Sequence, residues 1–159
     1  MQARMKHPVF VIPEALQALQ TLGRTTAAAG PSAQLLELVN LRASQINGCS
    51  ICVQMHSAAL RQHGETDERI FAVGAWRETP FFTPTERAAL ALAEAGTRIA
   101  DRPEAVSDEI WEEATRHYDE AELAALVLGI AGINLWNRVN GMTRQFVQES
   151  RPVVEAKSA

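Results

Sequence analysis

Apolar residues recur along most of this chain at intervals of three and four, the spacing that gathers side chains on one face of an α-helix. Leu35, Leu38 and Val39 follow this spacing, and Ile70 and Val73 repeat it further along. By contrast, no segment alternates apolar and polar β-branched residues as a strand would. The pattern therefore predicts an all-α protein.

Capping residues divide this helical pattern into about six to seven helices. The clearest start is at residues 83–86 (Thr-Pro-Thr-Glu), where a capping threonine, a proline at the first helical position and a glutamate three residues later agree. The sequence TTAAAG at residues 25–30, followed by Pro31, predicts a loop between the first two helices. The helices are expected to cover roughly residues 13–22, 32–47, 49–63, 66–76, 83–99, 107–117 and 119–140.

Length and composition favour one domain over residues 1–159, because a chain of this size with 47% hydrophobic residues can bury a single core. The longest apolar stretch, residues 123–133, is well short of the roughly 20 residues that cross a bilayer, so it predicts a buried helix and no membrane partner. Gly129 and Gly132 flatten one face of this helix, which predicts close helix packing, either within a subunit or across an interface between subunits. The net charge of -4 and the scattered Lys and Arg residues argue against a nucleic-acid partner. The first residues lack the apolar run of a secretory signal, which predicts a cytoplasmic protein.

The two cysteines of the chain, Cys49 and Cys52, are separated by only two residues. In a reducing compartment this spacing indicates redox chemistry or metal binding rather than a structural disulfide. At about 100° per residue around a helix, Cys49, Cys52 and His56 share one face. Residues three apart on a helix have Cα atoms about 5 Å apart, within the range that a disulfide accepts. The segment therefore predicts a dithiol that can close reversibly, with a histidine beside it.

A thiolate is the reactive form of cysteine, and two features of this segment lower a thiol pKa. The N-terminus of a helix and a nearby imidazole both stabilise a thiolate, and both favour Cys52. The preceding helix offers Glu37 as a carboxylate that could orient His56, with Ser44 and Gln45 as further polar groups. In an isolated helix, Glu37 would more often be a solvated side chain.

Two other interpretations of the cysteine cluster remain open. The two cysteines, with His56 and Glu37, could in principle ligate zinc, although structural zinc sites usually pair one Cys-x-x-Cys with a second, which the sequence lacks. The cysteines could also be inert packing residues. Redox catalysis is the preferred interpretation, and His7, like the other histidines outside the motif, is assigned no role.

The segment from Arg42 to His56, which reads Arg-Ala-Ser-Gln-Ile-Asn-Gly-Cys-x-x-Cys-x-x-x-His, resembles the core of the AhpD-like alkylhydroperoxidases in the carboxymuconolactone decarboxylase superfamily. Glu37 precedes this segment as a glutamate does in that family. The resemblance covers residues 30–145 and places the Cys-x-x-Cys motif at residues 49–52. It includes three further stretches, at residues 74–77, 85–88 and 133–138.

This resemblance implies a single-domain helical bundle that assembles as a homotrimer or a homohexamer. It implies reduction of organic hydroperoxides or hydrogen peroxide, with Cys52 as the attacking thiolate and Cys49 as the resolving thiol. Glu37 and His56 would form the proton relay for Cys52, and no bound cofactor would be needed. An external dithiol, from a lipoyl protein or a thioredoxin-like protein, would then reduce the disulfide. The sequence departs from the best-known members at Ile51, where they have another histidine.

Alternatives from other functional classes also remain. The dithiol could belong to a non-catalytic redox sensor or an oligomeric binding protein, in which oxidation changes assembly or affinity. It could also serve a disulfide reductase or a lactone-processing enzyme of the same superfamily, although members related to the lactone decarboxylase usually lack the Cys-x-x-Cys pair. Dithiol-dependent consumption of peroxide separates these classes, because a sensor oxidises once while an enzyme turns over.

Overall fold

The chain folds into α-helices joined by short loops, and the computed structural model describes residues 2–101 and 104–147. No strand is present among these residues, so the predicted all-α fold is confirmed. The α-helices are α1 (Pro8–Val11), α2 (Pro13–Ala29), α3 (Ala33–Asn47), α4 (Ser50–Gln62), α5 (Asp67–Ala72), α6 (Pro84–Thr97), α7 (Asp108–His117) and α8 (Glu120–Thr143). Two 3₁₀ turns, η1 (Val73–Glu78) and η2 (Ile99–Asp101), follow α5 and α6.

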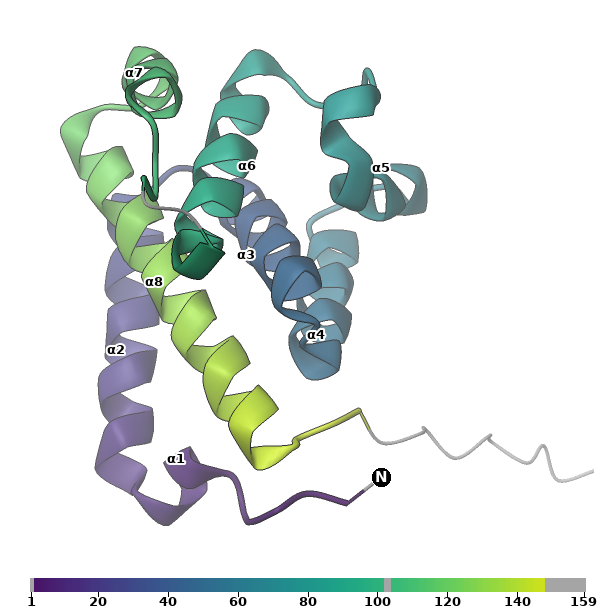
Figure 1. Cartoon of the computed structure of the whole chain (residues 1–159), viewed down its shortest axis with the longest axis vertical. Coiled ribbons are helices and arrows are strands. Elements are labelled where there is room, and N and C mark those ends of the chain that lie inside the picture. The colour runs from purple at the N-terminus through teal and green to yellow at the C-terminus, as the bar shows by residue number, and fades with distance from the viewer. Residues whose placement is uncertain (1, 102–103, 148–159) are drawn as a thin grey trace, which may run out of the picture.

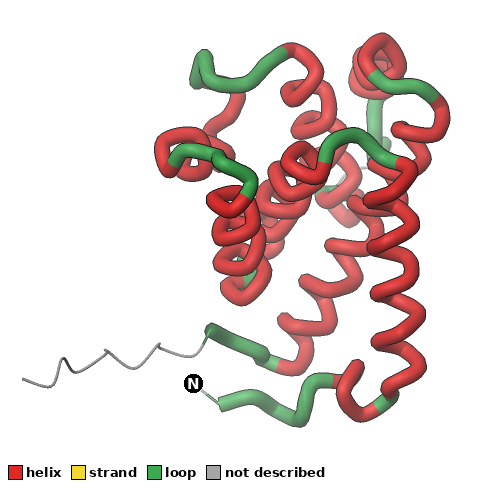
Figure 2. Tube along the Cα trace, turned by 180° about the vertical axis from the view of Figure 1, so that it is seen from behind, coloured by secondary structure: helices red, strands yellow, loops and turns green. Residues whose placement is uncertain are grey.

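Helix α3 lies at the centre of the bundle and packs against α4, α6 and α8. Its side chains Leu38, Val39 and Leu41 are fully buried, together with Leu90 of α6 and Leu126 of α8. Helix α8, the longest, runs beside α2 in the opposite direction (Figures 1 and 2). The four helices α2, α3, α4 and α8 therefore surround the part of the molecule that contains the two cysteines.

Side chains at the helix ends explain where the two clearest helices begin. The hydroxyl of Thr83 accepts a hydrogen bond from the backbone N–H of Glu86, and the Glu86 carboxylate accepts one from the backbone N–H of Thr83. Pro84 occupies the first helical position, where its missing N–H costs nothing. Asp119 and Glu122 make the same reciprocal pair at the start of α8. Both predicted helix starts are confirmed.

The loop predicted at residues 25–30 is wrong, because α2 continues to Ala29. Thr25 and Thr26 donate their hydroxyls to backbone carbonyls of the preceding turn, so neither interrupts the helix. The three alanines that follow are strong helix formers. The helix ends at Gly30, where a β-carbon would lie 2.8 Å from the carbonyl oxygen of Thr26 and 3.0 Å from Cβ of Ala125.

Three further details of the helices differ from the sequence prediction. The segment expected as one helix at residues 66–76 is α5 followed by η1, with non-helical backbone at Ala75 (φ -122°, ψ 31°). Helix α1 was not expected, and α8 extends to Thr143. These differences arise at helix ends, where contacts with the rest of the fold decide how far a helix continues.

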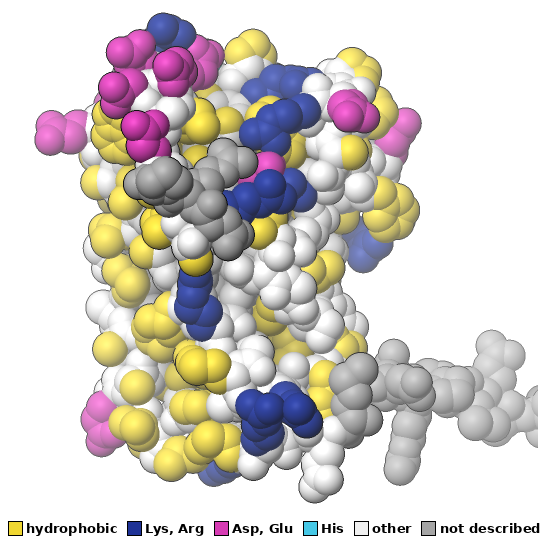
Figure 3. Space-filling view, in the orientation of Figure 1, with side chains coloured by type: hydrophobic (Ala, Val, Ile, Leu, Met, Phe, Trp, Pro, Cys, Tyr) yellow, Lys and Arg dark blue, Asp and Glu magenta, His cyan; other side chains and the backbone are white. Residues whose placement is uncertain are grey.

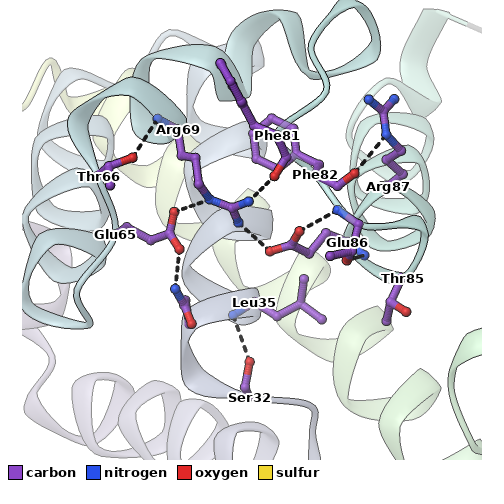
Figure 4. A network of polar contacts seen from close by, with 12 residues as sticks. Ser32, Leu35, Glu65, Thr66, Arg69, Phe81, Phe82, Thr85, Glu86 and Arg87 are labelled. Carbon is purple, nitrogen blue, oxygen red and sulfur yellow. Dashed lines mark hydrogen bonds and ion pairs between the residues drawn. The ribbon is translucent and has the colours of Figure 1, made fainter.

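Arg69 joins three parts of the fold through one polar network (Figure 4). Its guanidinium lies 2.6 Å from the Glu65 carboxylate and 2.5 Å from the Glu86 carboxylate, and it also donates to the backbone oxygen of Phe81. Gln34 of α3 donates to Glu65 in turn. The network therefore connects α5 with α3 and with the start of α6.

Glu94 of α6 forms a second polar centre, with a side chain only 11% exposed. Its Oε2 atom accepts hydrogen bonds from Arg42 at 2.9 Å, Arg77 at 2.8 Å and the indole N–H of Trp76 at 3.1 Å. Arg98 lies 3.3 Å from the other carboxylate oxygen. Since Arg42 belongs to α3 while Trp76 and Arg77 belong to η1, one carboxylate holds three elements together.

Charged side chains are unevenly distributed on the face that Figure 3 presents. Acidic side chains gather over α7, whereas Lys and Arg side chains are spread down the middle of this face (Figure 3). Among the described helices, none is both long and apolar enough to span a membrane. The apolar run at residues 123–133 instead belongs to α8, which packs against α2, α3 and α6.

Candidate functional site

A sharp turn between α3 and α4 places the two cysteines. Gly48 ends α3 in the left-handed conformation (φ 66°), which suits a residue without a side chain. Cys49 then occupies the N-cap position of α4, and its backbone N–H bonds the carbonyl of Ser44. Cys52 follows in the first turn of α4. The predicted placement of both cysteines at the start of one helix is therefore confirmed.

The two thiols form a buried pair. Their Sγ atoms are 2.7 Å apart, and the side chains are free cysteines rather than a disulfide. The hydrogen bond with Cys52 lowers the pKa of Cys49 to about 5, against the opposing effect of burial and with help from Asn140 and Asn137. The same hydrogen bond and burial raise the pKa of Cys52 above its ordinary value. The pair therefore loses one proton readily and retains the second.

The sequence argument expected the lowered pKa at Cys52, whereas the two thiols share one proton across their hydrogen bond, which lowers the pKa of Cys49 and raises that of Cys52. Asn140 of α8 donates its side-chain Nδ2 group towards both sulfur atoms, at 3.4 Å from Cys49 and 3.3 Å from Cys52. Amide donors of this kind stabilise a thiolate more than a thiol, because hydrogen bonds to charged acceptors are stronger.

His56 and Glu37 form a second pair beside the thiols. His56 lies one turn after Cys52 on α4, and its Nδ1 atom is 2.6 Å from Oε2 of Glu37 on α3. The carboxylate is an acceptor and therefore favours the tautomer in which Nδ1–H donates to it, and in the neutral ring this leaves the lone pair of Nε2 available. Nε2 is buried and has no hydrogen-bond partner among the described residues. The structure thus brings Glu37 to His56, and Glu37 is not merely a solvated side chain.

A cavity of about 630 Å³ opens beside these residues. Cys52, His56 and Glu37 line it, whereas Cys49 does not. Its walls come from α2, α3, α4 and α8 and from the N-terminal segment, and most of the lining is apolar, including Leu19, Leu22, Leu36, Leu128, Ile133 and Trp136. Of the two sulfur atoms, Cys52 is therefore the one that faces a space large enough for an organic molecule.

The two glycines of α8 contribute to this cavity, so within the chain they do not serve the close helix packing that the sequence predicted as one alternative. Gly129 and Gly132 both line the space. A β-carbon at Gly132 would meet no other atom within 4 Å, and one at Gly129 would reach Leu36 only at an ordinary contact distance of 3.9 Å. The missing side chains thus leave room in the cavity.

The carboxymuconolactone decarboxylase family has a model that matches residues 13–95 of this chain. The chain is also 38% identical over 130 residues to the uncharacterized protein YdfG of Bacillus subtilis (strain 168), an alignment that covers 82% of this chain and 87% of YdfG. It belongs to the carboxymuconolactone decarboxylase family. Within this family it is AhpD-like, because two further comparisons point to AhpD.

The first of these is a crystal structure of an Agrobacterium tumefaciens protein of unknown function, whose description links it provisionally to the antioxidant defence protein AhpD. The two folds superpose with a TM-score of 0.85 at 33% identity, covering 93% of this chain and all of that chain. The second is the alkyl hydroperoxide reductase AhpD of Hyphomonas neptunium. It is 53% identical over 36 residues, which cover 23% of this chain and 20% of that protein.

Ile51 lies between the two cysteines of this AhpD-like member of the carboxymuconolactone decarboxylase family. Its side chain lines the cavity next to Cys52, where the resemblance leads one to expect a histidine. The imidazole that stands beside Cys52 on α4 is therefore that of His56 alone. No group of three or more His, Cys, Asp or Glu side chains in the described part of the chain could hold a metal ion.

Sequence reasoning about this family member missed the asparagines of α8. Asn134, Asn137 and Asn140 recur at intervals of three in a mainly apolar helix, and all three are buried. Asn47 donates to Asn134 and Asn137 at 2.9 Å, and Asn137 donates to Ser44 at 3.2 Å. These bonds attach α8 to the end of α3. Regular polar positions in an apolar helix were the signal that could have identified them.

The other polar groups that the sequence suggested do not join the His56 pair. Ser44 accepts the hydrogen bond from Asn137, on the α8 side of the thiols. The side-chain oxygen of Gln45 is buried without a hydrogen-bond partner in the described residues. His7, to which the sequence assigned no role, instead lines the cavity and contacts Asn140.

Proposed function

We propose that this protein is a thiol-dependent peroxidase that reduces organic hydroperoxides through a Cys49/Cys52 dithiol–disulfide cycle. One observation carries this proposal. A pair of adjacent thiols faces an apolar cavity through Cys52, next to a histidine whose Nε2 is free and whose Nδ1 is held by a carboxylate. The AhpD-like family membership gives independent support, since one matching relative is an alkyl hydroperoxide reductase.

The first step requires negative charge on Cys52. The pair shares one proton across the S–H···S hydrogen bond, and when Cys49 carries that proton and donates it to Cys52, the negative charge lies on Cys52. The Cys52 thiolate then attacks the terminal oxygen of the hydroperoxide, and the O–O bond breaks. Nε2 of His56 accepts the hydrogen of that terminal oxygen and passes it to the departing alkoxide, which leaves as an alcohol. Cys52 becomes a sulfenate.

The second step closes the disulfide. The proton on Cys49 passes to the sulfenate of Cys52, so that Cys49 is again a thiolate and Cys52 a sulfenic acid. Cys49 attacks the Cys52 sulfur, the S–O bond breaks, and the hydroxide that leaves takes a proton from solvent and becomes water. An external dithiol, from a lipoyl or thioredoxin-like protein, restores both thiols by exchange. Overall, one hydroperoxide and one external dithiol give one alcohol, one water and one external disulfide.

The lining of the cavity favours organic hydroperoxides over hydrogen peroxide. Burial of an alkyl or aryl group against leucine, isoleucine and tryptophan side chains contributes binding free energy that hydrogen peroxide cannot obtain. The terminal oxygen of such a substrate can reach Cys52 while its carbon chain stays in the cavity.

The test is consumption of cumene hydroperoxide with dihydrolipoamide as the dithiol. Cys52→Ser should abolish consumption, because the attacking sulfur is lost. Cys49→Ser should allow one oxidation of Cys52 per chain and no further turnover. His56→Ala should slow the reaction by about 10²–10⁴-fold and Glu37→Gln by about 10–100-fold, since the first moves a proton and the second only orients it.

The matched control is His63→Ala, since His63 is an exposed histidine at the other end of the same helix. It should turn over like the unaltered protein. If Cys52→Ser still consumes hydroperoxide, the assigned nucleophile is wrong. If the unaltered protein oxidises once and never turns over with any dithiol, the protein is a redox sensor instead.

The proposal includes assembly as a homotrimer or homohexamer. Val127, Leu128 and Leu135 of α8 and Trp111 of α7 are large apolar side chains that are 40–47% exposed, which is unfavourable for a surface in contact with water. Light scattering at micromolar concentration tests this point. A single species near 17.4 kDa, the mass of one chain, would contradict it.

A further inference from the structure

His7 reaches the thiol pair through Asn140. The N-terminal residues lie beside the C-terminal end of α8, where α1 and α8 approach one another (Figure 1). Nε2 of His7 is 3.0 Å from Oδ1 of Asn140, and Nδ2 of the same amide points at the sulfur atoms of Cys49 and Cys52. A chain of hydrogen bonds therefore runs from the N-terminal segment to both thiols.

The hydrogen bonds of the His7 ring determine where its proton lies. Nδ1 accepts a hydrogen bond from the backbone N–H of Val9 at 3.3 Å, as the cap of α1. A neutral imidazole that accepts at Nδ1 carries its proton on Nε2. His7 consequently donates to Oδ1 of Asn140. This bond requires that the amide oxygen, and not the amide nitrogen, face His7.

The orientation of this amide matters because its two ends have opposite effects on a thiolate. With Nδ2 towards the sulfur atoms, N–H groups stabilise the negative charge. With the amide turned over, Oδ1 would face the sulfur atoms with its lone pairs and destabilise that charge. Because Nε2–H of His7 is a donor, it favours the first orientation. In the turned amide, Nδ2–H of Asn140 would face Nε2–H of His7, and two donors cannot form a hydrogen bond with each other.

The surroundings hold His7 in this position. The backbone N–H of Arg4 bonds the carbonyl of Thr143 at 2.9 Å, and the side chain of Gln145 donates to the carbonyl of Met5 at 3.0 Å. The His7 ring also packs against Trp136, with ring centroids 5.8 Å apart. These contacts fix the N-terminal segment to the end of α8 next to the thiols.

We propose that His7 is a positioning residue, which orients the Asn140 amide so that its N–H groups stabilise the thiolate shared by Cys49 and Cys52. This role of His7 rests on the proposed thiol chemistry, although it can be measured without any peroxide. The titratable side chains that line the cavity with Cys52 are Glu37 and His56, from α3 and α4, and His7 itself. The side chains that α8 brings to the thiols are uncharged: Asn140, which donates to both sulfur atoms, and Asn137, whose hydrogen bond also favours the thiolate.

The test measures the thiolate directly. Absorbance at 240 nm between pH 4 and pH 9 gives the thiolate fraction, and mass spectrometry after iodoacetamide treatment gives the alkylation rate of each cysteine. His7→Phe keeps a ring against Trp136 and removes the donor, so alkylation at pH 6 should slow roughly tenfold or more. His7→Gln can still donate to Oδ1 and should restore most of the rate.

A double-mutant cycle separates positioning from a general disturbance of the fold. Asn140→Ala should slow alkylation at least as much as His7→Phe, and the double variant should be no slower than Asn140→Ala alone, because His7 acts only through Asn140. His63→Phe is the matched control and should alkylate at the unaltered rate.

Three results would overturn the role of His7. The first is a normal alkylation rate for His7→Phe at every pH. The second is equal slowing in His7→Phe and His7→Gln, since loss of packing or folding would not distinguish them. The third is a double variant whose slowing is the product of the two single effects. None of these depends on peroxide turnover, so each is distinct from a failure of the proposed peroxidase function.

Discussion

Replacement of Glu94 by glutamine tests how much one carboxylate contributes to this fold. Burial raises the pKa of Glu94, but hydrogen bonds from Arg77, Arg42 and Trp76 outweigh it and hold the pKa at about 2, against an ordinary value of 4.5. A difference of this size corresponds to about 3 kcal/mol of stability. Glu94→Gln has nearly the same shape but no charge, and it leaves the buried guanidinium of Arg42 without a counter-ion.

The free energy of unfolding should therefore fall by about 2–3 kcal/mol at pH 7, equivalent to a Tm lower by roughly 4–12 °C for a chain of this length. The sign of the pH dependence follows from the direction of the shift. The folded pKa is below the unfolded one, so the stabilisation is complete above pH 4.5 and is lost as the pH falls towards 2. The difference in unfolding free energy between the unaltered protein and Glu94→Gln should become smaller over that pH range.

The assay is urea unfolding followed by circular dichroism at pH 7, 5 and 3, at one protein concentration because assembly also stabilises the folded state. Glu113→Gln is the matched control, since Glu113 pairs with Arg116 and His117 on the exposed surface of α7 and should contribute no measurable stability. Two results would refute the reasoning. One is that Glu94→Gln loses less than about 1 kcal/mol of unfolding free energy at pH 7. The other is that its difference from the unaltered protein stays constant down to pH 3.

Two further changes test the cavity and the turn. Gly132→Leu should place a side chain in the cavity and raise KM for cumene hydroperoxide about tenfold or more, while KM for hydrogen peroxide changes little. Steady-state kinetics with both substrates check this, and an equal change for both would contradict it. Gly48→Ala should cost about 1 kcal/mol in urea unfolding, because its φ of 66° is unfavourable for a residue with a β-carbon. Unchanged stability would show that the turn tolerates a side chain.

Local signals in the sequence were enough for the parts of the fold that depend on neighbouring residues. The caps at Thr83 and Asp119 were predicted because each involves residues only three apart. The loop expected at residues 25–30 failed because TTAAAG followed by a proline suggests a break, whereas the two threonine hydroxyls bond carbonyls of their own helix and the alanines favour helix. The break comes only at Gly30.

The candidate site likewise combines contacts that are local in the sequence with contacts between distant residues. Cys52 and His56 lie one turn apart on α4 and Cys49 is the N-cap residue of the same helix, so spacing along the sequence is enough to place them near one another. The pairing of Glu37 with His56 depends on how α3 packs against α4. Helical periodicity cannot predict that packing, and the pairing was expected from the resemblance. Asn140 and His7 meet the thiols only through contacts between residues 88 to 133 positions apart. Spacing along the sequence carries no information about such contacts.

The attachment of the N-terminal segment to the end of α8 has a consequence for the order of folding. The turn that brings Cys49 to Cys52 involves adjacent residues and needs no distant partner, whereas the bond between His7 and Asn140 closes a loop of 133 residues. Closure of long loops is entropically costly and comes after local structure. During synthesis, Asn140 emerges long after both cysteines. The two thiols can thus come together well before Asn140 is synthesised. In a nascent chain of that length, the thiolate lacks the N–H groups of Asn140 that stabilise it.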